Sequence, residues 1–231
     1  LLSRGLGDVY KRQVYERRSF SVKVINEAAL SPVTLAQARK NSRIDHEDDD
    51  QHIQDCIDAA TGYVQRMTDT ALITTLFEWK MDRFPLGSTP LYLPRWPVQS
   101  IASISYTDTN GTTQTIASNS YSLRADNSGR GRISLVSWNP WPSTLNSPDS
   151  VSIRFHAGFG DSPTDVPREW QKPILLLASH WIENREATVG SMSKQIEFSV
   201  SALLDALRDP DDGQDFDLGS FNDSYWRWAS Q

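Results

Sequence analysis

Apolar residues recur with helical spacing at both ends of this chain and with strand-like spacing in its middle. The clearest helical stripe consists of Ile53, Cys56, Ile57, Ala60, Tyr63, Val64 and Met67. The acidic run 45–50 precedes it, at the end where a helix dipole stabilises carboxylates. A shorter helix is predicted over 35–44, because Thr34 and Gln37 have the spacing of a capping box.

The middle of the chain is rich in β-branched and aromatic residues, with Gly, Pro and Asn between the runs. The predicted strands are 72–82, 101–106, 113–116, 121–124, 132–136 and 151–156, and 91–93 is predicted to be a short extended piece. Asn110-Gly111 favours a tight hairpin turn, because both residues tolerate positive φ. The Pro- and Trp-rich stretch 138–150 is expected to be an ordered surface loop.

Helical spacing returns with Trp170, Ile174, Leu177 and Trp181 in a helix that is expected to end near Glu186. A last short helix is predicted over 199–208. This order predicts an α+β fold: a small helical domain of two N-terminal and two C-terminal helices, with an inserted antiparallel β subdomain of five or six strands. The first and last helical segments are expected to share one core.

The pattern suggests five segments. They are a non-native or disordered leader (1–20), an N-terminal helical part (21–71), a β-rich insert (72–160), a C-terminal helical part (161–208) and an acidic, aromatic tail (209–231). The leader resembles a translated adapter remnant and is not expected to belong to the fold.

The charge and composition of the chain argue against several classes of function. The net charge is −6 and no dense basic stripe occurs, which disfavours a protein that grips DNA tightly. Cys56 is the only cysteine, so an internal disulfide framework and a cysteine-based zinc site are excluded. No stretch is long and apolar enough to predict a membrane span or a signal peptide.

No motif predicts catalysis, a metal site or a cofactor. The run 46–50 is interpreted as an acidic helix start, because neighbouring residues entering a helix splay apart rather than converge on a cation. His180 and Glu183 have a spacing used in metal bundles, but no second pair accompanies them. Gly158-Phe159-Gly160 lacks the third glycine of a dinucleotide-binding turn. We therefore expect no catalytic, metal-binding or cofactor-binding residues.

Eight tryptophans are unusually many for 231 residues. Those in the loop 138–150 and in the tail are candidate interface anchors, because exposed aromatic side chains often anchor protein interfaces. The predicted interface residues are Trp138, Trp141, Tyr225, Trp226, Arg227 and Trp228. For the tail, folding back onto the parent domain and plain disorder are the alternatives.

Eight blocks of sequence in a fixed order resemble a known protein family. The blocks are 32–39, 43–50, 70–73, 79–85, 93–101, 154–160, 174–186 and 198–204. Together they resemble the head–tail connector (adaptor, head-completion) proteins of long-tailed bacteriophages, in the branch that carries a β-insert. The resemblance covers about residues 22–208, and the leader and tail lie outside it.

The resemblance implies a structural protein. Such adaptors form a homo-oligomeric ring, typically of twelve copies, beneath the portal protein of the head. The ring extends the DNA channel and docks the next head-completion or tail protein, and DNA passes through without tight binding. The expected location is the neck of the virion, assembled in the host cytoplasm, with no membrane and no cofactor.

Two other classes of function stay open. A Trp-rich module for carbohydrate or peptide would use Trp96, Trp138 and Trp141 as a stacking platform. A small metal-dependent hydrolase would use His46, His52 or His180.

The tail gives the first testable prediction. Deleting 209–231 is expected to leave the domain folded but to weaken assembly with copies or partners, because the tail holds candidate aromatic anchors outside the patterned fold. Circular dichroism and sedimentation of the full-length and shortened chains check both parts. Unchanged assembly would show that the tail is dispensable.

Overall fold

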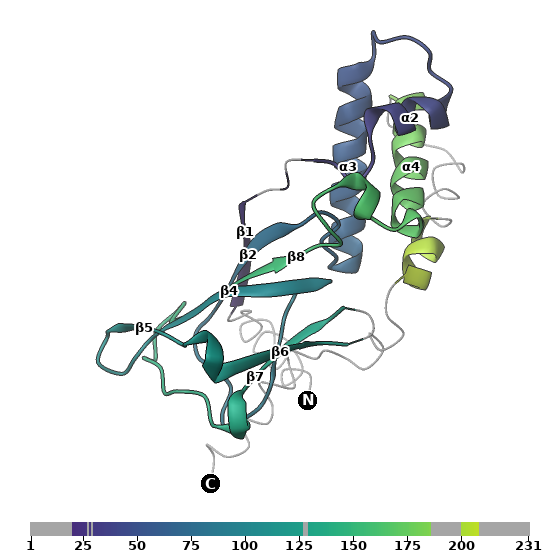
Figure 1. Ribbon diagram of the computed structural model, residues 1–231. Helices are drawn as coiled ribbons and strands as arrows, with labels where there is room; N and C mark the ends of the chain where they lie inside the picture. Colours follow the sequence, from purple (N-terminus) through teal and green to yellow (C-terminus); the bar gives the residue numbers. More distant parts are fainter. Residues whose placement is uncertain (1–19, 27, 29, 127–128, 186–199, 208–231) are drawn as a thin grey trace, which may run out of the picture. The chain divides into compact units, whose positions relative to one another are not determined.

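The structure is a computed structural model that describes residues 20–26, 28, 30–126, 129–185 and 200–207. It divides into two compact units. The β unit comprises the described residues up to Pro32 together with Asp69–Val166, and the helical unit comprises Val33–Thr68 and the described residues from Pro167 onward. The α+β fold class is confirmed, with helical segments on either side of a β-rich segment in the chain (Figure 1).

The helical unit contains α2 (Leu35–Ser42), α3 (Asp50–Thr68), α4 (Arg168–Glu183) and a short helix over 200–207. The predicted capping box is present at the start of α2: the Gln37 backbone N–H donates to Thr34 Oγ1, and Gln37 Oε1 accepts from the Thr34 N–H. The helix ends at Ser42, two residues before the predicted end, because Arg43 adopts a left-handed conformation with φ 55°.

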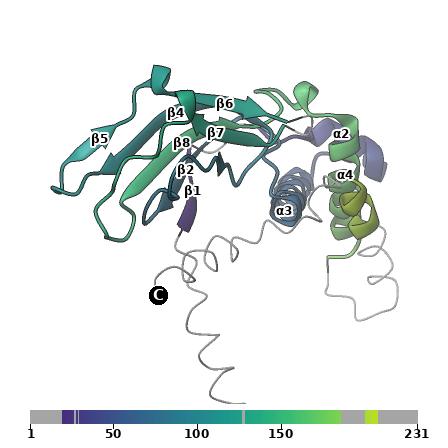
Figure 2. The same cartoon turned by 90° about the horizontal axis from the view of Figure 1, so that it is seen from below.

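The first and last helical segments do share a core, as expected (Figure 2). Helix α3 contacts α4, and α2 contacts both. Ile53, Ile57 and Val64 of α3 are fully buried, as is Ile174 of α4, and the predicted apolar stripes account for these positions. Trp181, expected in the same core, is only half-buried.

The β unit contains two antiparallel sheets. The larger has the order β1-β2-β8-β4-β5, built from β1 (Phe20–Asn26), β2 (Thr75–Met81), β8 (Val151–Ala157), β4 (Val98–Thr107) and β5 (Thr113–Thr115). The smaller has the order β3-β7-β6, built from β3 (Leu91–Tyr92), β7 (Gly131–Leu135) and β6 (Tyr121–Ala125). Short 3-10 helices follow at η1 (Ser118–Ser120), η2 (Val136–Trp138) and η3 (Pro163–Asp165).

One apolar core joins the two sheets. Strand β8 alternates strictly, with Val151, Ile153 and Phe155 fully buried on one face. Phe155 stacks on Phe77 of β2 with ring centroids 5.6 Å apart, and Ile133 of β7 is buried in the same cluster. The two sheets therefore share one hydrophobic core and belong to the same compact unit.

Strand β1 is the main difference from the prediction. The described residues form eight strands, against the five or six expected, and β1 lies in a segment that was assigned to the N-terminal helical part 21–71. The period-two pattern of Phe20, Val22 and Val24 is a strand signal that the prediction did not use. Strand β1 pairs with β2, and the described residues from Phe20 to Pro32 therefore belong to the β unit, although they precede α2 in the chain.

The glycine motif at the end of β8 is structural. Gly158 has φ 145°, and a Cβ there would lie within 2.6 Å of the backbone of Ile73 and Thr74. The Gly160 carbonyl accepts from the Thr74 N–H at 2.9 Å, and the Gly158 N–H donates to the Pro97 carbonyl at 2.8 Å. The motif thus allows three chain segments to approach closely. This packing role accounts for the two glycines without a nucleotide-binding function.

Replacing this glycine tests the close approach. Gly158→Ala is expected to destabilise the β unit by more than about 3 kcal/mol, because the added methyl group meets backbone that cannot move aside and the φ angle becomes strained. Urea denaturation followed by intrinsic fluorescence measures the change.

Gly111→Ala is the matched control, because Gly111 also has positive φ (81°) but open space around it. It is expected to cost about 1 kcal/mol. Equal losses in the two variants would contradict the structural role of the motif.

Candidate functional site

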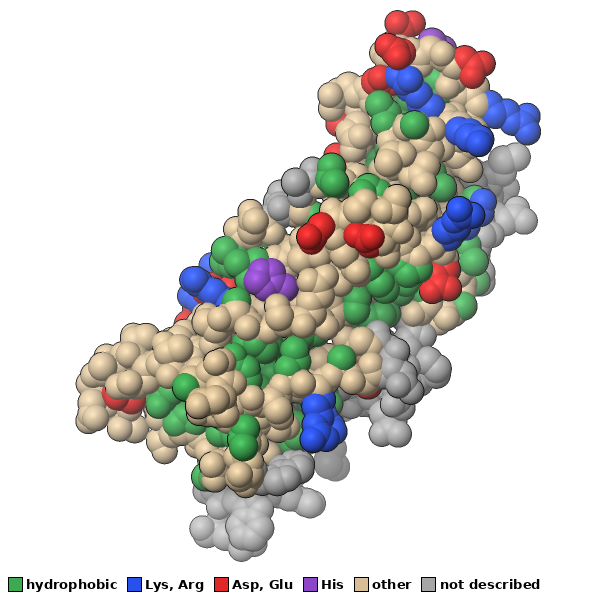
Figure 3. All heavy atoms as spheres, viewed as in Figure 1, with side chains coloured by type: hydrophobic (Ala, Val, Ile, Leu, Met, Phe, Trp, Pro, Cys, Tyr) green, Lys and Arg blue, Asp and Glu red, His purple; other side chains and the backbone are tan. Residues whose placement is uncertain are grey.

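The acidic run before α3 is ion-paired within the helical unit. Arg39 of α2 bonds Asp50 at the first turn of α3, with its Nε 2.7 Å from Asp50 Oδ1. Arg185, just after α4, donates to Asp49 Oδ1 at 2.5 Å and thereby lowers the pKa of that carboxyl. Figure 3 shows acidic and basic side chains gathered over this end of the unit. The run therefore connects helices, in agreement with its interpretation as an acidic helix start.

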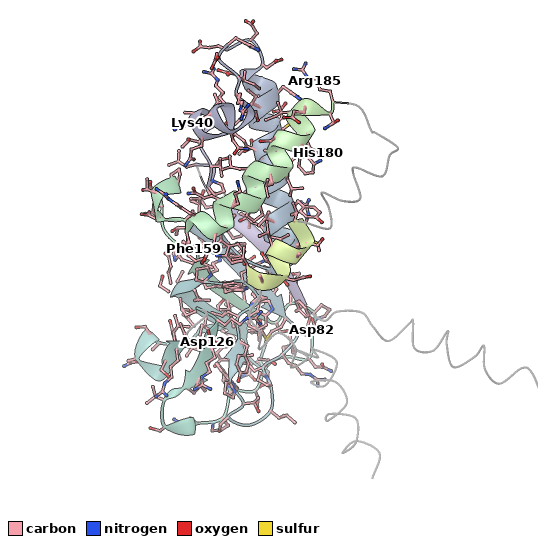
Figure 4. All side chains as sticks on the ribbon, turned by 90° about the vertical axis from the view of Figure 1, so that its right-hand side faces the viewer. Lys40, Asp82, Asp126, Phe159, His180 and Arg185 are labelled. Carbon is pink, nitrogen blue, oxygen red and sulfur yellow. The ribbon has the colours of Figure 1, made fainter. Side chains whose placement is uncertain are left out.

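The three histidines proposed for a hydrolase make separate local contacts. His180 Nδ1 lies 3.1 Å from Asn184 Nδ2 near the end of α4, where Figure 4 labels it close to Arg185. His52 Nε2 lies 3.8 Å from Cys56 Sγ, one turn along α3. His46 is exposed, with Nδ1 4.0 Å from Asp48. In the described part of the chain, no group of three or more His, Cys, Asp or Glu side chains could hold a metal ion.

A serine–histidine pair that the sequence did not single out lies on the larger sheet. Ser100 Oγ on β4 is 3.3 Å from His156 Nδ1 on β8. Nucleophilic catalysis also needs a group that orients the histidine and donors that stabilise an oxyanion. Among the described residues no carboxylate is bonded to His156, so the pair does not form a triad.

A polar cluster occupies the face of the larger sheet opposite the core. Glu78 on β2 pairs in register with Arg154 on β8, whose Nε donates to Glu78 Oε1 at 3.0 Å. Ser152 Oγ donates to the same oxygen at 3.1 Å, and Lys80 Nζ lies 3.9 Å from the carboxylate. Burial alone would raise the pKa of Glu78, but the bonds from Arg154 and Ser152 outweigh it and hold the pKa below its usual value.

The predicted aromatic interface residues fall into three groups. Trp141 is buried in the β unit: its ring stacks on Phe84 at 4.7 Å, and its Nε1 donates to the Thr89 carbonyl at 2.8 Å. Trp138 ends η2, and its side chain lies outside the described part of the structure. Tyr225, Trp226, Arg227 and Trp228 lie outside the described residues.

The structure differs from the prediction at Trp141, because the loop 138–150 packs its ring inward instead of presenting it to solvent. The hydrogen bond to Thr89 satisfies the indole N–H, so the ring can be buried without leaving that polar group unpaired. Trp96, the third member of the proposed stacking platform, is also buried. Two of the three rings are therefore unable to form an exposed carbohydrate platform.

Exposed apolar side chains occur instead in β1, at the edge of the larger sheet, and in the segment just after it. Val24 is 47% exposed, Ile25 46% and Leu30, four residues after the strand, 53%. The pairing of β1 with β2 is interrupted between Val24 and Asn26, which makes Ile25 a bulge residue. A sequence search for loop and tail aromatics could not find this site, because its residues are aliphatic and lie in a strand.

An open groove of about 300 Å³ lies at the opposite edge of the β unit. Its lining includes Tyr106, Thr115, Ile116, Leu135, Asn139 and Pro142, which come from both sheets and from the loops after β5 and η2. Figure 3 shows hydrophobic side chains reaching the surface in this region of the unit. The groove is shallow and lacks a cluster of titratable groups, so its character is that of a docking surface rather than a catalytic pocket.

No described helix has the length and apolar character needed to span a membrane.

One protein family matches part of the chain in the comparisons with known proteins. Residues 32–128 match the sequence model of the family described as "Phage gp6-like head-tail connector protein". The resemblance predicted from the sequence is thereby confirmed, and the matched family supports a structural connector role. A search of curated protein sequences finds no match.

Solved structures with the same fold come from gene transfer agent (GTA) particles. A chain from the virion of a native GTA particle has a TM-score of 0.67 at 23% identity, with 81% of this chain and 94% of that chain covered. A chain from the neck of an empty GTA particle, computed with C6 symmetry, has a TM-score of 0.68 at 22% identity, and the match covers 81% of this chain and 95% of that chain. A chain from the neck of a native particle, computed with C12 symmetry, has a TM-score of 0.62 at 22% identity, and the match covers 81% of this chain and 94% of that chain. At these identities the likeness establishes the fold.

The Glu78 cluster gives a prediction for stability and its pH dependence. Glu78→Gln is expected to destabilise the β unit by about 1–3 kcal/mol near neutral pH, because Arg154 and Ser152 lose a charged acceptor. Since the folded-state pKa is lowered from 4.5, this contribution is present above about pH 4.5 and is lost as pH falls through the folded-state pKa.

Urea denaturation at several pH values measures the difference between the two proteins, which is expected to shrink in acid. Asp161→Asn, an exposed carboxylate in the same unit, is the control and is expected to change stability by less than about 0.5 kcal/mol. A difference that stays constant with pH would show that the charge of Glu78 does not carry the effect.

Proposed function

We propose that this chain is a head–tail connector subunit that forms a ring beneath the portal of a phage-like particle. The match of residues 32–128 to the connector family carries this proposal. The fold shared with chains from GTA necks computed with C6 and C12 symmetry supports a ring, for which we propose twelve copies. The ring extends the DNA channel and docks the next head-completion or tail protein.

The charges of the chain suit a channel through which DNA slides. Net charge is −6, so the chain as a whole offers no excess of cations to hold phosphates. In the helical unit, Arg39 and Arg185 are bonded to Asp50 and Asp49, which reduces their availability to a DNA backbone. Passage without tight binding follows from this balance.

The proposed role is structural, and no reaction is assigned to the chain. The neck of the virion is the proposed location, reached by assembly in the host cytoplasm. The aromatic tail residues Tyr225, Trp226, Arg227 and Trp228 stay candidate contacts for a neighbouring protein, and Trp138 stays a candidate in the β unit.

Co-expression with the cognate portal protein tests the proposal. Electron microscopy of the purified complex is expected to show an added ring at the narrow end of the portal, with rotational symmetry that gives the copy number. Portal expressed alone is the control and defines the density to be subtracted. A portal without additional density, purified in the presence of excess folded chain, would contradict the proposal.

A further inference from the structure

Among the described residues, the larger sheet of the β unit ends in two edge strands of different character. Its order places β1 at one edge and β5 at the other, with three strands between them (Figure 1). Because neighbouring strands lie roughly 4.8 Å apart, the two edges are about 19 Å apart across the sheet. An edge strand exposes unpaired backbone groups that can bind another chain.

The β1 edge is apolar. Val24 and Ile25 are each nearly half exposed, and Lys23 is the only charged residue of the strand. Proteins normally protect exposed apolar edges with charges, proline or a covering element, because such edges bind other strands. The bulge at Ile25 aims an aliphatic side chain away from the ladder with β2.

The β5 edge is complementary in chemistry. Thr113, Gln114 and Thr115 are polar and exposed, and the groove beside them is partly apolar. Asp108 at the start of this hairpin accepts hydrogen bonds from the Thr112 N–H, the Gln114 side-chain amide and the Asn110 N–H, which together lower the pKa of its carboxyl. One edge therefore carries a cation beside apolar side chains, and the other carries an anion in its hairpin and a groove of mixed polar and apolar lining next to β5.

The apolar side chain at the β1 edge and the groove at the β5 edge lie on the same face of the larger sheet. Phe20 and Val22 of β1 pack against the core, so Val24, two residues on, lies on the core face of the strand. Tyr106 lies on the core face of β4 with Ile104, and the Ile116 N–H donates to the Ile104 carbonyl. A head-to-tail joint that continues the sheet would bring Val24 of one copy to the side on which the groove opens.

We propose that β1 of one copy docks along β5 of the next copy, with Val24 and Ile25 seated in the groove lined by Tyr106, Ile116, Leu135 and Pro142. This joint uses two different surfaces of each subunit, which is the type of interface that closes into a ring. Lys23 of one copy faces the hairpin that carries Asp108 of the next. The inference rests on the proposed ring and assigns the surfaces that build it.

Cysteine crosslinking tests the joint. Asn26→Cys and Thr115→Cys are placed together in a Cys56→Ala background; both sites are exposed, and neither change removes an apolar contact of the joint. Complexes with the portal are treated with a short bismaleimide and run on a denaturing gel. A ladder of dimers, trimers and larger species is expected, because each chain then links to two neighbours.

Two controls separate this joint from other contacts. Chains with Asn26→Cys alone or Thr115→Cys alone are expected to remain monomers on the gel. Asn26→Cys combined with Ser122→Cys, on the exposed edge strand β6 of the smaller sheet, is expected to give no ladder.

The outcomes distinguish this inference from the proposed function. A ring at the portal without a ladder from the Asn26/Thr115 pair overturns the joint and leaves the ring in place. A ladder from the Asn26/Ser122 pair alone would assign a different edge. Dimers from Asn26→Cys alone would show a symmetric contact between two β1 edges, which also overturns the proposal. Absence of any ring from the wild-type chain contradicts the proposed function itself.

Discussion

The pairing of β2 with β8 is the contact on which the β unit depends. Strand β8 lies between β2 and β4, and each core-facing side chain from Val151 to Phe155 is fully buried. A shift of one residue in the register would move Ile153 and Phe155 to the polar face and Arg154 into the core. The opposite face reinforces the same register, because Glu78 meets Arg154 only when β2 and β8 pair as observed.

This constraint also determines how the chain is divided. Strands β2 and β8 are distant in sequence, so everything between them forms within the β unit, including the smaller sheet and its shared core. Helices α3 and α4 lie on either side of that segment in the chain and pack together in the helical unit. A helical domain interrupted by a β insert follows from these two long-range pairings.

Local signals in the sequence predicted much of this arrangement. The Thr34–Gln37 capping box is present as predicted, the strand predicted over 151–156 is present as β8, and five of the seven residues of the predicted helical stripe are buried in α3. Each of these signals depends on residues that are close together in the sequence. Strand β1 was not predicted: its alternating pattern spans only Phe20, Val22 and Val24, and a short edge strand gains its stability from β2, far along the chain. The burial of Trp141 was equally hidden, since it depends on Phe84 and Thr89 in another loop. The groove and the apolar edge likewise require the order of strands in the sheet, which periodicity does not give.

A connector ring joined through the two edges of the larger sheet would be visible in the neck itself. The decisive measurement is a cryo-electron microscopy reconstruction of a particle neck containing the chain, at a resolution that separates strands. Density for β1 of each subunit is expected to run beside β5 of its neighbour, with Val24 and Ile25 against the groove. A neck that contains the chain as single copies, or as a ring in which both sheet edges face solvent, would contradict this expectation.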